Sequence, residues 1–119
     1  MRILITDLNT KIHKDLEKKS AASEVEFDIY KTANDVTEES WNKAHGVITY
    51  RYSKNVMNAI SKINNTKIIV RGGVGFDGLD LNKLGQKGIA VCTVPDYGTT
   101  EVADHAIGLM LMMRRGLDQ

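Results

Sequence analysis

Five short runs of apolar and β-branched residues alternate along this chain with segments of helical pattern. The runs are Arg2 to Thr6, Val25 to Tyr30, Gly46 to Tyr50, Lys67 to Arg71 and Ile89 to Val94. Runs of this length are typical of strands, and strands that are separated by helices join in a parallel sheet. Because crossovers between parallel strands are right-handed, the order predicts an α/β fold, a flavodoxin-like doubly wound five-stranded parallel sheet with helices on both faces.

Residues that favour helix starts precede several of the segments between the strands. We expect Thr10, Thr37, Ser53 and Asp77 to cap helices, the third of which carries Val56, Met57, Ile60 and Ile63. The helix after Asp77 is short and is expected to cover about Asp80 to Gln86. A last helix is predicted from about Thr100 to Arg115, capped by Thr99 or Thr100.

Bulk properties exclude several classes of protein. The chain has 119 residues, enough for one domain, and its 16 basic and 15 acidic residues leave a charge of +1, so we expect neither nucleic-acid nor membrane binding. The single cysteine, Cys92, excludes an internal disulfide and is expected to pack within its strand. No signal segment precedes the first strand, so a cytoplasmic protein is expected. His13, His45 and His105 are scattered, and no metal site is expected.

The most distinctive motif is a glycine-rich loop after the fourth strand, in which Gly73, Gly75 and Gly78 have the spacing G-x-G-x-x-G. This spacing is that of a dinucleotide-binding fingerprint, but such a motif continues into a long helix and normally follows the first strand of its domain. Here Phe76 and Asp77 interrupt the motif and the next helix is short. Two other interpretations stay open: a nest of backbone N–H groups that binds one carboxylate, and a tight turn without a ligand.

Arg71 to Arg115, "RGGVGFDGLDLNKLGQKGIAVCTVPDYGTTEVADHAIGLMLMMRR", resembles the end of the N-terminal portion of the D-isomer-specific 2-hydroxyacid dehydrogenases. The G-x-G-x-D-N-x-D loop, the G-I-x-V-x-N-x-P strand and the V-A-D/E helix of that family follow one another at the family's spacing. The family includes D-3-phosphoglycerate dehydrogenases, glyoxylate and hydroxypyruvate reductases and the C-terminal-binding-protein corepressors. Gly78 stands where the family usually has Asn. By this resemblance the loop is a carboxylate-binding loop.

The resemblance also implies roles for individual residues. It implies that the backbone N–H groups of Val74 and Gly75 bind the substrate carboxylate. It also implies that Arg51 lines the substrate-binding cleft, where its guanidinium pairs with an anionic group of the substrate. It assigns Val74 and Thr99 to the side from which the nicotinamide cofactor approaches. Tyr52 stands where many relatives have a small residue, which bears on the shape of the pocket.

The resemblance further divides the chain into a substrate-binding domain, residues 1–98, and an interdomain helix, residues 99–119, leading to a cofactor domain that this chain is expected to lack. The family's catalytic histidine, glutamate and arginine lie in or beyond that domain, so no catalytic residue is expected here. The complete protein is then expected to transfer a hydride between NAD, or NADP, and a small 2-hydroxy or 2-oxo acid. This chain alone is expected to bind the cofactor weakly and to be inactive.

The apolar character of the last helix leaves a second reading. Its residues from Val102 to Met113 are apolar nearly all round, which predicts burial on more than one side. A core helix of this one domain would explain only one apolar face, and the resemblance implies a homodimer contact. The alternative to an enzyme domain is therefore a non-catalytic dimerising interaction module, corepressor-like or standing alone.

Overall fold

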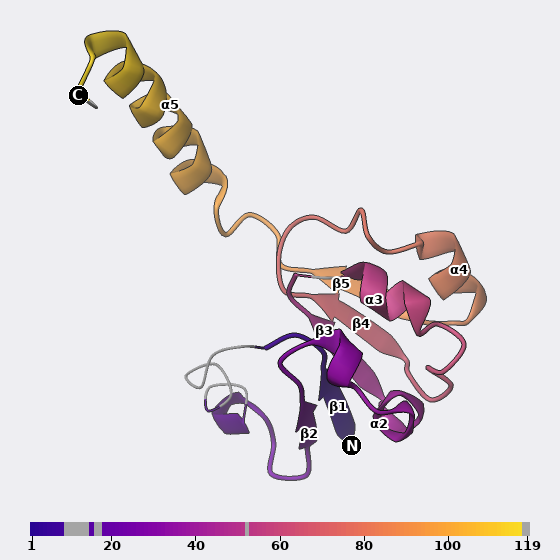
Figure 1. The fold of residues 1–119 in the computed structure, drawn as a ribbon. Coiled ribbons are helices and arrows are strands. Elements are labelled where there is room, and N and C mark those ends of the chain that lie inside the picture. Colours follow the sequence, from indigo (N-terminus) through magenta and orange to yellow (C-terminus); the bar gives the residue numbers. More distant parts are fainter. Residues whose placement is uncertain (9–14, 16–17, 52, 118–119) are drawn as a thin grey trace.

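The structure is a computed structural model that describes residues 1–8, 15, 18–51 and 53–117. Within these residues the chain forms one parallel sheet of five strands in the order β2-β1-β3-β4-β5 (Figure 1). The strands are β1 (Arg2–Ile5), β2 (Glu26–Ile29), β3 (Gly46–Thr49), β4 (Ile68–Arg71) and β5 (Ala90–Thr93). All five predicted strands and the flavodoxin-like order are confirmed.

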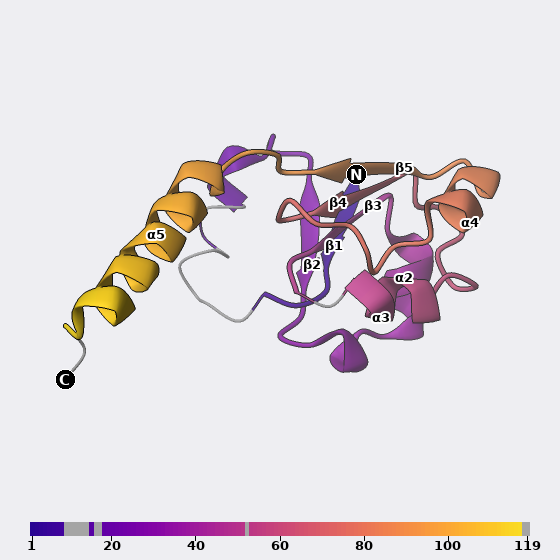
Figure 2. The ribbon, with the colours of Figure 1, turned by 90° about the horizontal axis from the view of Figure 1, so that it is seen from above.

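Three short helices cover one face of the sheet. They are α2 (Glu38–Lys43), α3 (Ser53–Asn58) and α4 (Leu81–Gln86), and a 3-10 turn, η1 (Ala33–Asp35), precedes them (Figures 1 and 2). The core between these helices and the sheet includes Leu4, Trp41, Val56, Ile69 and Leu84. The helix expected between β1 and β2 lies largely outside the described residues, as does its cap, Thr10.

The helix starts agree with the sequence at one position and differ at two. The Thr37 hydroxyl oxygen accepts a hydrogen bond from Ser40 N at 3.2 Å, as the capping pattern predicts. Ser53 is the first residue of α3, and this helix ends at Asn58, so Ile60 lies in the turn that follows and Ile63 comes after that turn. Asp77 does not cap α4. Leu79 N donates a hydrogen bond to Phe76 O and closes a turn, so the helix begins later in the sequence and Asp80 is its cap.

The second face of the sheet carries an apolar cavity of about 300 Å³, lined in part by Ile3, Phe27, Ile68 and Val70.

Cys92 pairs with Val70 across β4 and β5, and its side chain is exposed. The expectation that Cys92 is packed is therefore wrong. The apolar run of its strand suggested burial, but β5 is at the edge of the sheet, and its residues are exposed or half-buried.

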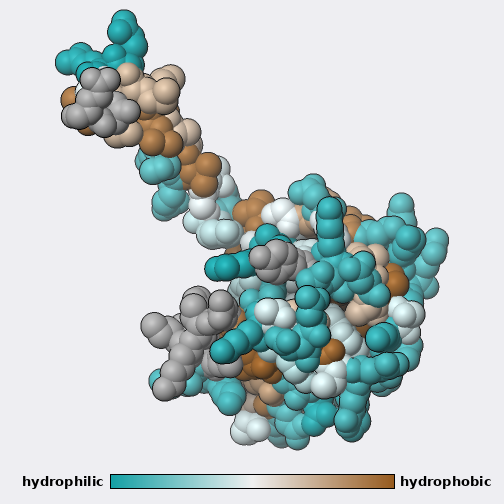
Figure 3. All heavy atoms as spheres, viewed as in Figure 1, coloured by the Kyte–Doolittle hydropathy of each residue, from teal (hydrophilic) through white to brown (hydrophobic). Residues whose placement is uncertain are grey.

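The last helix, α5 (Thr99–Arg115), projects away from the sheet and extends the molecule to 55 × 33 × 24 Å (Figures 1 and 2). It has no buried residue, so the reading of α5 as a core helix of this domain is wrong. Figure 3 shows hydrophobic atoms along its length, and the exposed fractions of its large apolar side chains reach 73 % at Met113. Its N-cap is Gly98 rather than Thr99 or Thr100. None of the described helices is long and apolar enough to span a membrane.

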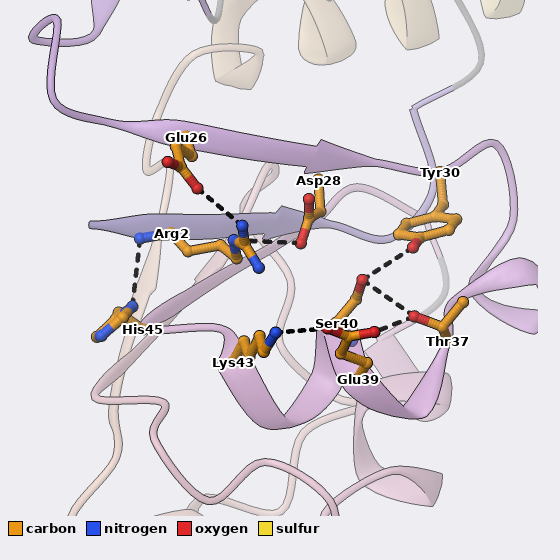
Figure 4. A network of polar contacts seen from close by, with 9 residues as sticks. All are labelled: Arg2, Glu26, Asp28, Tyr30, Thr37, Glu39, Ser40, Lys43 and His45. Carbon is orange, nitrogen blue, oxygen red and sulfur yellow. Dashed lines mark hydrogen bonds and ion pairs between the residues drawn. The ribbon is translucent and has the colours of Figure 1, made fainter.

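A polar network holds β1 and β2 to α2 (Figure 4). Arg2 Nη2 donates to Glu26 Oε2 at 2.8 Å, its Nε lies 3.7 Å from Asp28 Oδ2, and the first contact lowers the pKa of the Glu26 carboxyl. Tyr30 and Ser40 share a hydrogen bond of 2.8 Å between their hydroxyls. These contacts fix the edge strand in register, because Arg2 and Glu26 are paired residues of the ladder.

Candidate functional site

The candidate site lies at the carboxyl edge of the sheet, where ligands of doubly wound folds bind. Since the strands are parallel, the loops after β1, β3, β4 and β5 all begin at this edge. Two backbone hydrogen bonds join them: Gly72 N donates to Thr49 O at 2.9 Å, and Val94 N donates to Gly73 O at 3.1 Å. The glycine loop, residues 72–78, is therefore held between the loops that follow β3 and β5.

The glycines of this loop allow close approach. A Cβ atom at Gly72 would overlap the Tyr50 ring, and one at Gly73 would overlap the Arg71 guanidinium. At Gly78 it would lie 2.9 Å from Ser53 Cβ and 3.2 Å from Lys54 N. These glycines do not have φ in the left-handed region, which among the described residues is found at Gly88, Asp96 and Gly116. The loop therefore lacks the alternating right- and left-handed residues of one kind of nest, and any anion it binds must be held by amides in a turn conformation.

Backbone amides in the loop are nevertheless open to a ligand. Gly72 N and Gly73 N donate to Thr49 O and Arg71 O, at 2.9 and 2.8 Å. Within the described part of the chain, the amides of Val74 and Gly75 have no hydrogen-bond partner, and both residues are exposed. Donors of this kind are those that a carboxylate accepts from.

A cavity of about 260 Å³ brings the loop together with the start of α3. It is lined by Arg51, Ser53, Lys54, Arg71, Gly75, Asp77 and Gly78. Of the residues predicted for substrate, Arg51 and Gly75 thus meet here, whereas Val74 does not line the cavity, nor does Thr99, which was predicted for the cofactor side. Three cationic side chains against one carboxylate make the cavity suitable for an anion. Tyr52 is outside the described residues.

Asp7 is a residue of this edge that the sequence did not single out. It follows β1, is only 5 % exposed, and its carboxylate accepts from two consecutive amides, Tyr50 N at 2.8 Å and Arg51 N at 2.6 Å. The available signal was an acidic residue directly after a buried strand, at the carboxyl edge where ligands of doubly wound sheets bind.

Thr99 lies at the start of α5, where its hydroxyl donates to Asp96 Oδ1 at 2.6 Å. Asp96 has φ of 63°, a left-handed conformation that aspartate tolerates better than most residues. This bond stabilises the turn between β5 and α5. The cofactor role of Thr99 stays a prediction.

The described residues do not fit the pyrophosphate of a dinucleotide. A fingerprint loop leaves the N-terminus of a helix open to phosphate, but at the start of α4 the Asp80 carboxylate accepts from Lys83 N at 3.0 Å. That hydrogen bond lowers the pKa of Asp80, which places a negative charge at the position a phosphate would take. Among the residues that the structure describes, no cluster of His, Cys, Asp and Glu suits a metal ion.

Comparisons with known proteins agree on one family. The family model described as "D-isomer specific 2-hydroxyacid dehydrogenase, catalytic domain" matches residues 3–109. A D-3-phosphoglycerate dehydrogenase of Methanocaldococcus jannaschii is 32% identical over 120 residues, which cover 100% of this chain and 22% of the relative. The chain thus spans less than a quarter of that relative's length.

Solved structures resemble the chain over almost its whole length. One is a D-lactate dehydrogenase from Aquifex aeolicus, complexed with NAD and lactic acid. The match covers 98% of this chain and 36% of the dehydrogenase chain, with a TM-score of 0.80 and 28% identity. An NADPH-dependent glyoxylate/hydroxypyruvate reductase from Sinorhizobium meliloti, in complex with NADP and malonate, matches 93% of this chain and 33% of its own, with a TM-score of 0.71 and 28% identity.

Proposed function

This chain belongs to the D-isomer specific 2-hydroxyacid dehydrogenases, whose catalytic domain it matches, and we propose that it binds the carboxylate of a small 2-hydroxy or 2-oxo acid. The observation that carries the proposal is the pair of amides at Val74 and Gly75, which have no hydrogen-bond partner among the residues that the structure describes, beside the cavity that Arg51 and Gly75 line. The amides bind one carboxylate oxygen each or share one, and the guanidinium adds a charge-assisted hydrogen bond.

The lining of the cavity favours acids with a second negative group. Besides Arg51 it presents Lys54 and Arg71, against the single carboxylate of Asp77. One carboxylate does not balance three cations, so a phosphate or second carboxylate on the substrate would be stabilised. The Methanocaldococcus relative is named for a phosphorylated acid of this kind, D-3-phosphoglycerate.

The reaction proposed for the complete protein is hydride transfer between NAD or NADP and this acid. Solved relatives are titled as complexes with NAD and with NADP. Because the residues described here do not supply a pyrophosphate site, we assign to residues 1–98 the binding and orientation of the acid, and to the helix from Thr99 the link to the cofactor-binding part. The exposed, unpaired Cys92 favours a reducing compartment such as the cytoplasm. The chain alone is then expected to bind the acid without turnover.

Isothermal titration of the chain with oxalate, phosphoglycolate and acetamide tests this proposal. We expect both acids to bind, phosphoglycolate more tightly, and neutral acetamide not to bind. Arg51→Gln should weaken oxalate binding about tenfold, as expected for the loss of a hydrogen bond between charged groups. Arg115→Gln, which removes an equal charge at the far end of α5, should leave it unchanged. Absence of saturable oxalate binding would refute the proposed function.

The exposed apolar helix α5 supports a homodimer, and with it the alternative of a non-catalytic dimerising module. Val102, Leu109 and Met113 are exposed and recur at helical spacing. Two α5 helices that pack antiparallel would bring Glu101 of one helix near Arg114 of the other, and these opposite charges attract each other. Light scattering should give twice the chain mass, and Leu109→Glu should halve it, whereas Lys87→Glu on the sheet domain should not. Dimerisation without any affinity for oxalate would favour the non-catalytic module.

A further inference from the structure

We propose that Asp7 is the positioning residue of the acid-binding site: from the end of β1, its carboxylate holds the loop after β3 so that Arg51 and the glycine loop share one cavity. The inference rests on the proposed function. Asp7 itself does not line that cavity and is given no contact with the substrate.

The contacts of Asp7 reach across the fold. Its Oδ1 accepts from Tyr50 N at 2.8 Å and from the Thr6 hydroxyl at 3.2 Å, and its Oδ2 accepts from Arg51 N at 2.6 Å. Tyr50 and Arg51 lie 43 and 44 residues away in the sequence. Hydrogen bonds to a buried carboxylate are among the stronger ones in proteins. Because both oxygens bind successive amides, the backbone at Arg51 has little freedom to turn.

The same contacts reach the glycine loop through Tyr50. The Tyr50 ring lies directly over Gly72, where no Cβ fits, and Gly72 N is bound to Thr49 O. A shift of the Tyr50 backbone would therefore move its ring against the loop that carries the Val74 and Gly75 amides. One carboxylate thus positions both partners of the acid: the cation through Arg51 N and the amides through the Tyr50 ring.

The charge of Asp7 and its positioning role predict opposite effects on the affinity for the acid, and this difference makes the inference testable. A buried negative charge near an anion site repels the anion, so removing it should strengthen binding if electrostatics were its only influence. Asp7→Asn keeps the size of the side chain, but its NH2 group would face one of the two backbone N–H groups. Positioning therefore predicts weaker binding from Asp7→Asn.

The experiment compares oxalate titrations of the wild type, Asp7→Asn, Arg51→Gln and the double variant. Asp77→Asn is the matched control, because it removes a carboxylate that lines the cavity but accepts no hydrogen bond from a backbone amide of the described residues. We expect Asp7→Asn to weaken binding about tenfold and Asp77→Asn to strengthen it, and the double variant to lose less than the two single losses multiplied. Asp7→Glu, which restores the charge, should recover part of the affinity.

Equal or tighter binding by Asp7→Asn, or independent effects of the two substitutions, would overturn the role of Asp7 and leave the proposed function standing. Failure of the wild type to bind oxalate would instead refute the proposed function, and this role with it. A second measurement needs no variant: oxalate should slow amide hydrogen exchange at Tyr50 and Arg51 as well as at Val74 and Gly75. Slowing confined to Val74 and Gly75 would also overturn the inference.

Discussion

Gly78→Ala is the most informative single change in the glycine loop, because it tests why glycine stands there. A Cβ at this position would lie 2.9 Å from Ser53 Cβ and 3.2 Å from the backbone N of Lys54. Carbon atoms in contact are ordinarily about 3.5–4.0 Å apart, so the loop and the start of α3 must separate by roughly 0.6 to 1 Å. Ser53 is buried and Lys54 N is backbone, so neither can simply swing aside.

The expected loss of stability follows from this overlap. Overpacking of this kind typically costs about 1–3 kcal/mol, against about 0.4–1 kcal/mol gained because alanine restricts the unfolded chain. We therefore expect a net loss of about 1–2 kcal/mol, which in a domain of this size lowers Tm by roughly 5–15 °C. Because Ser53, Lys54 and Gly78 all line the cavity, oxalate affinity should fall as well.

Thermal unfolding followed by circular dichroism and an oxalate titration measure the two effects. Gly85→Ala is the control: it lies within α4, no atom comes within 4 Å of an added Cβ, and alanine in a helix is better by about 0.5–1 kcal/mol. It should raise Tm and leave oxalate binding unchanged. If Gly78→Ala were as stable as the wild type and bound oxalate equally well, the close-approach explanation of the loop would be refuted.

Three further predictions concern the rest of the fold. Asp80 should titrate below its ordinary pKa of 3.8 by NMR, so its stabilisation of α4 is complete above pH 3.8 and disappears as the pH falls through the lowered value; titration at or above 3.8 would contradict this. Leu84→Ala should cost about 2–5 kcal/mol in urea unfolding, because Leu84 is fully buried in the core; a loss below about 1 kcal/mol would argue against its packing there. Cys92 should react with a thiol reagent in the folded protein as fast as in urea, and slow reaction relieved only by unfolding would show that the outer face of β5 is covered.

The strands of the sheet could be predicted because the sequence pattern that marks each strand lies within a few consecutive residues. Each strand is an apolar run bounded by helix-forming or turn residues, and the alternation in Val25 to Tyr30 also predicts the edge position of β2. Helix ends were less predictable. Apolar residues continue at helical spacing to Ile63, yet α3 ends at Asn58, and Ile63 is buried from irregular backbone beyond the helix.

The site was predictable only in part, since its geometry depends on contacts between distant segments. The glycine spacing indicated the loop, and the family resemblance indicated Arg51, Val74 and Gly75. The position of Asp7 after a buried strand was a signal, but its role could not be identified by pattern, because the amides it binds come from a loop 43 residues away and meet it only through the pairing of β1 with β3. The close approach that explains Gly72, Gly73 and Gly78 was unpredictable for the same reason, because Tyr50, Arg71 and Ser53 are brought to these glycines by the fold.

Titration of the nitrogen-15-labelled chain with oxalate, followed by amide NMR, shows whether the glycine loop and Arg51 bind one carboxylate together. We expect saturable shifts at the Val74 and Gly75 amides and at Arg51, with one affinity for all three. Shifts that do not saturate, or that fall on other parts of the chain while these three amides stay in place, would contradict it.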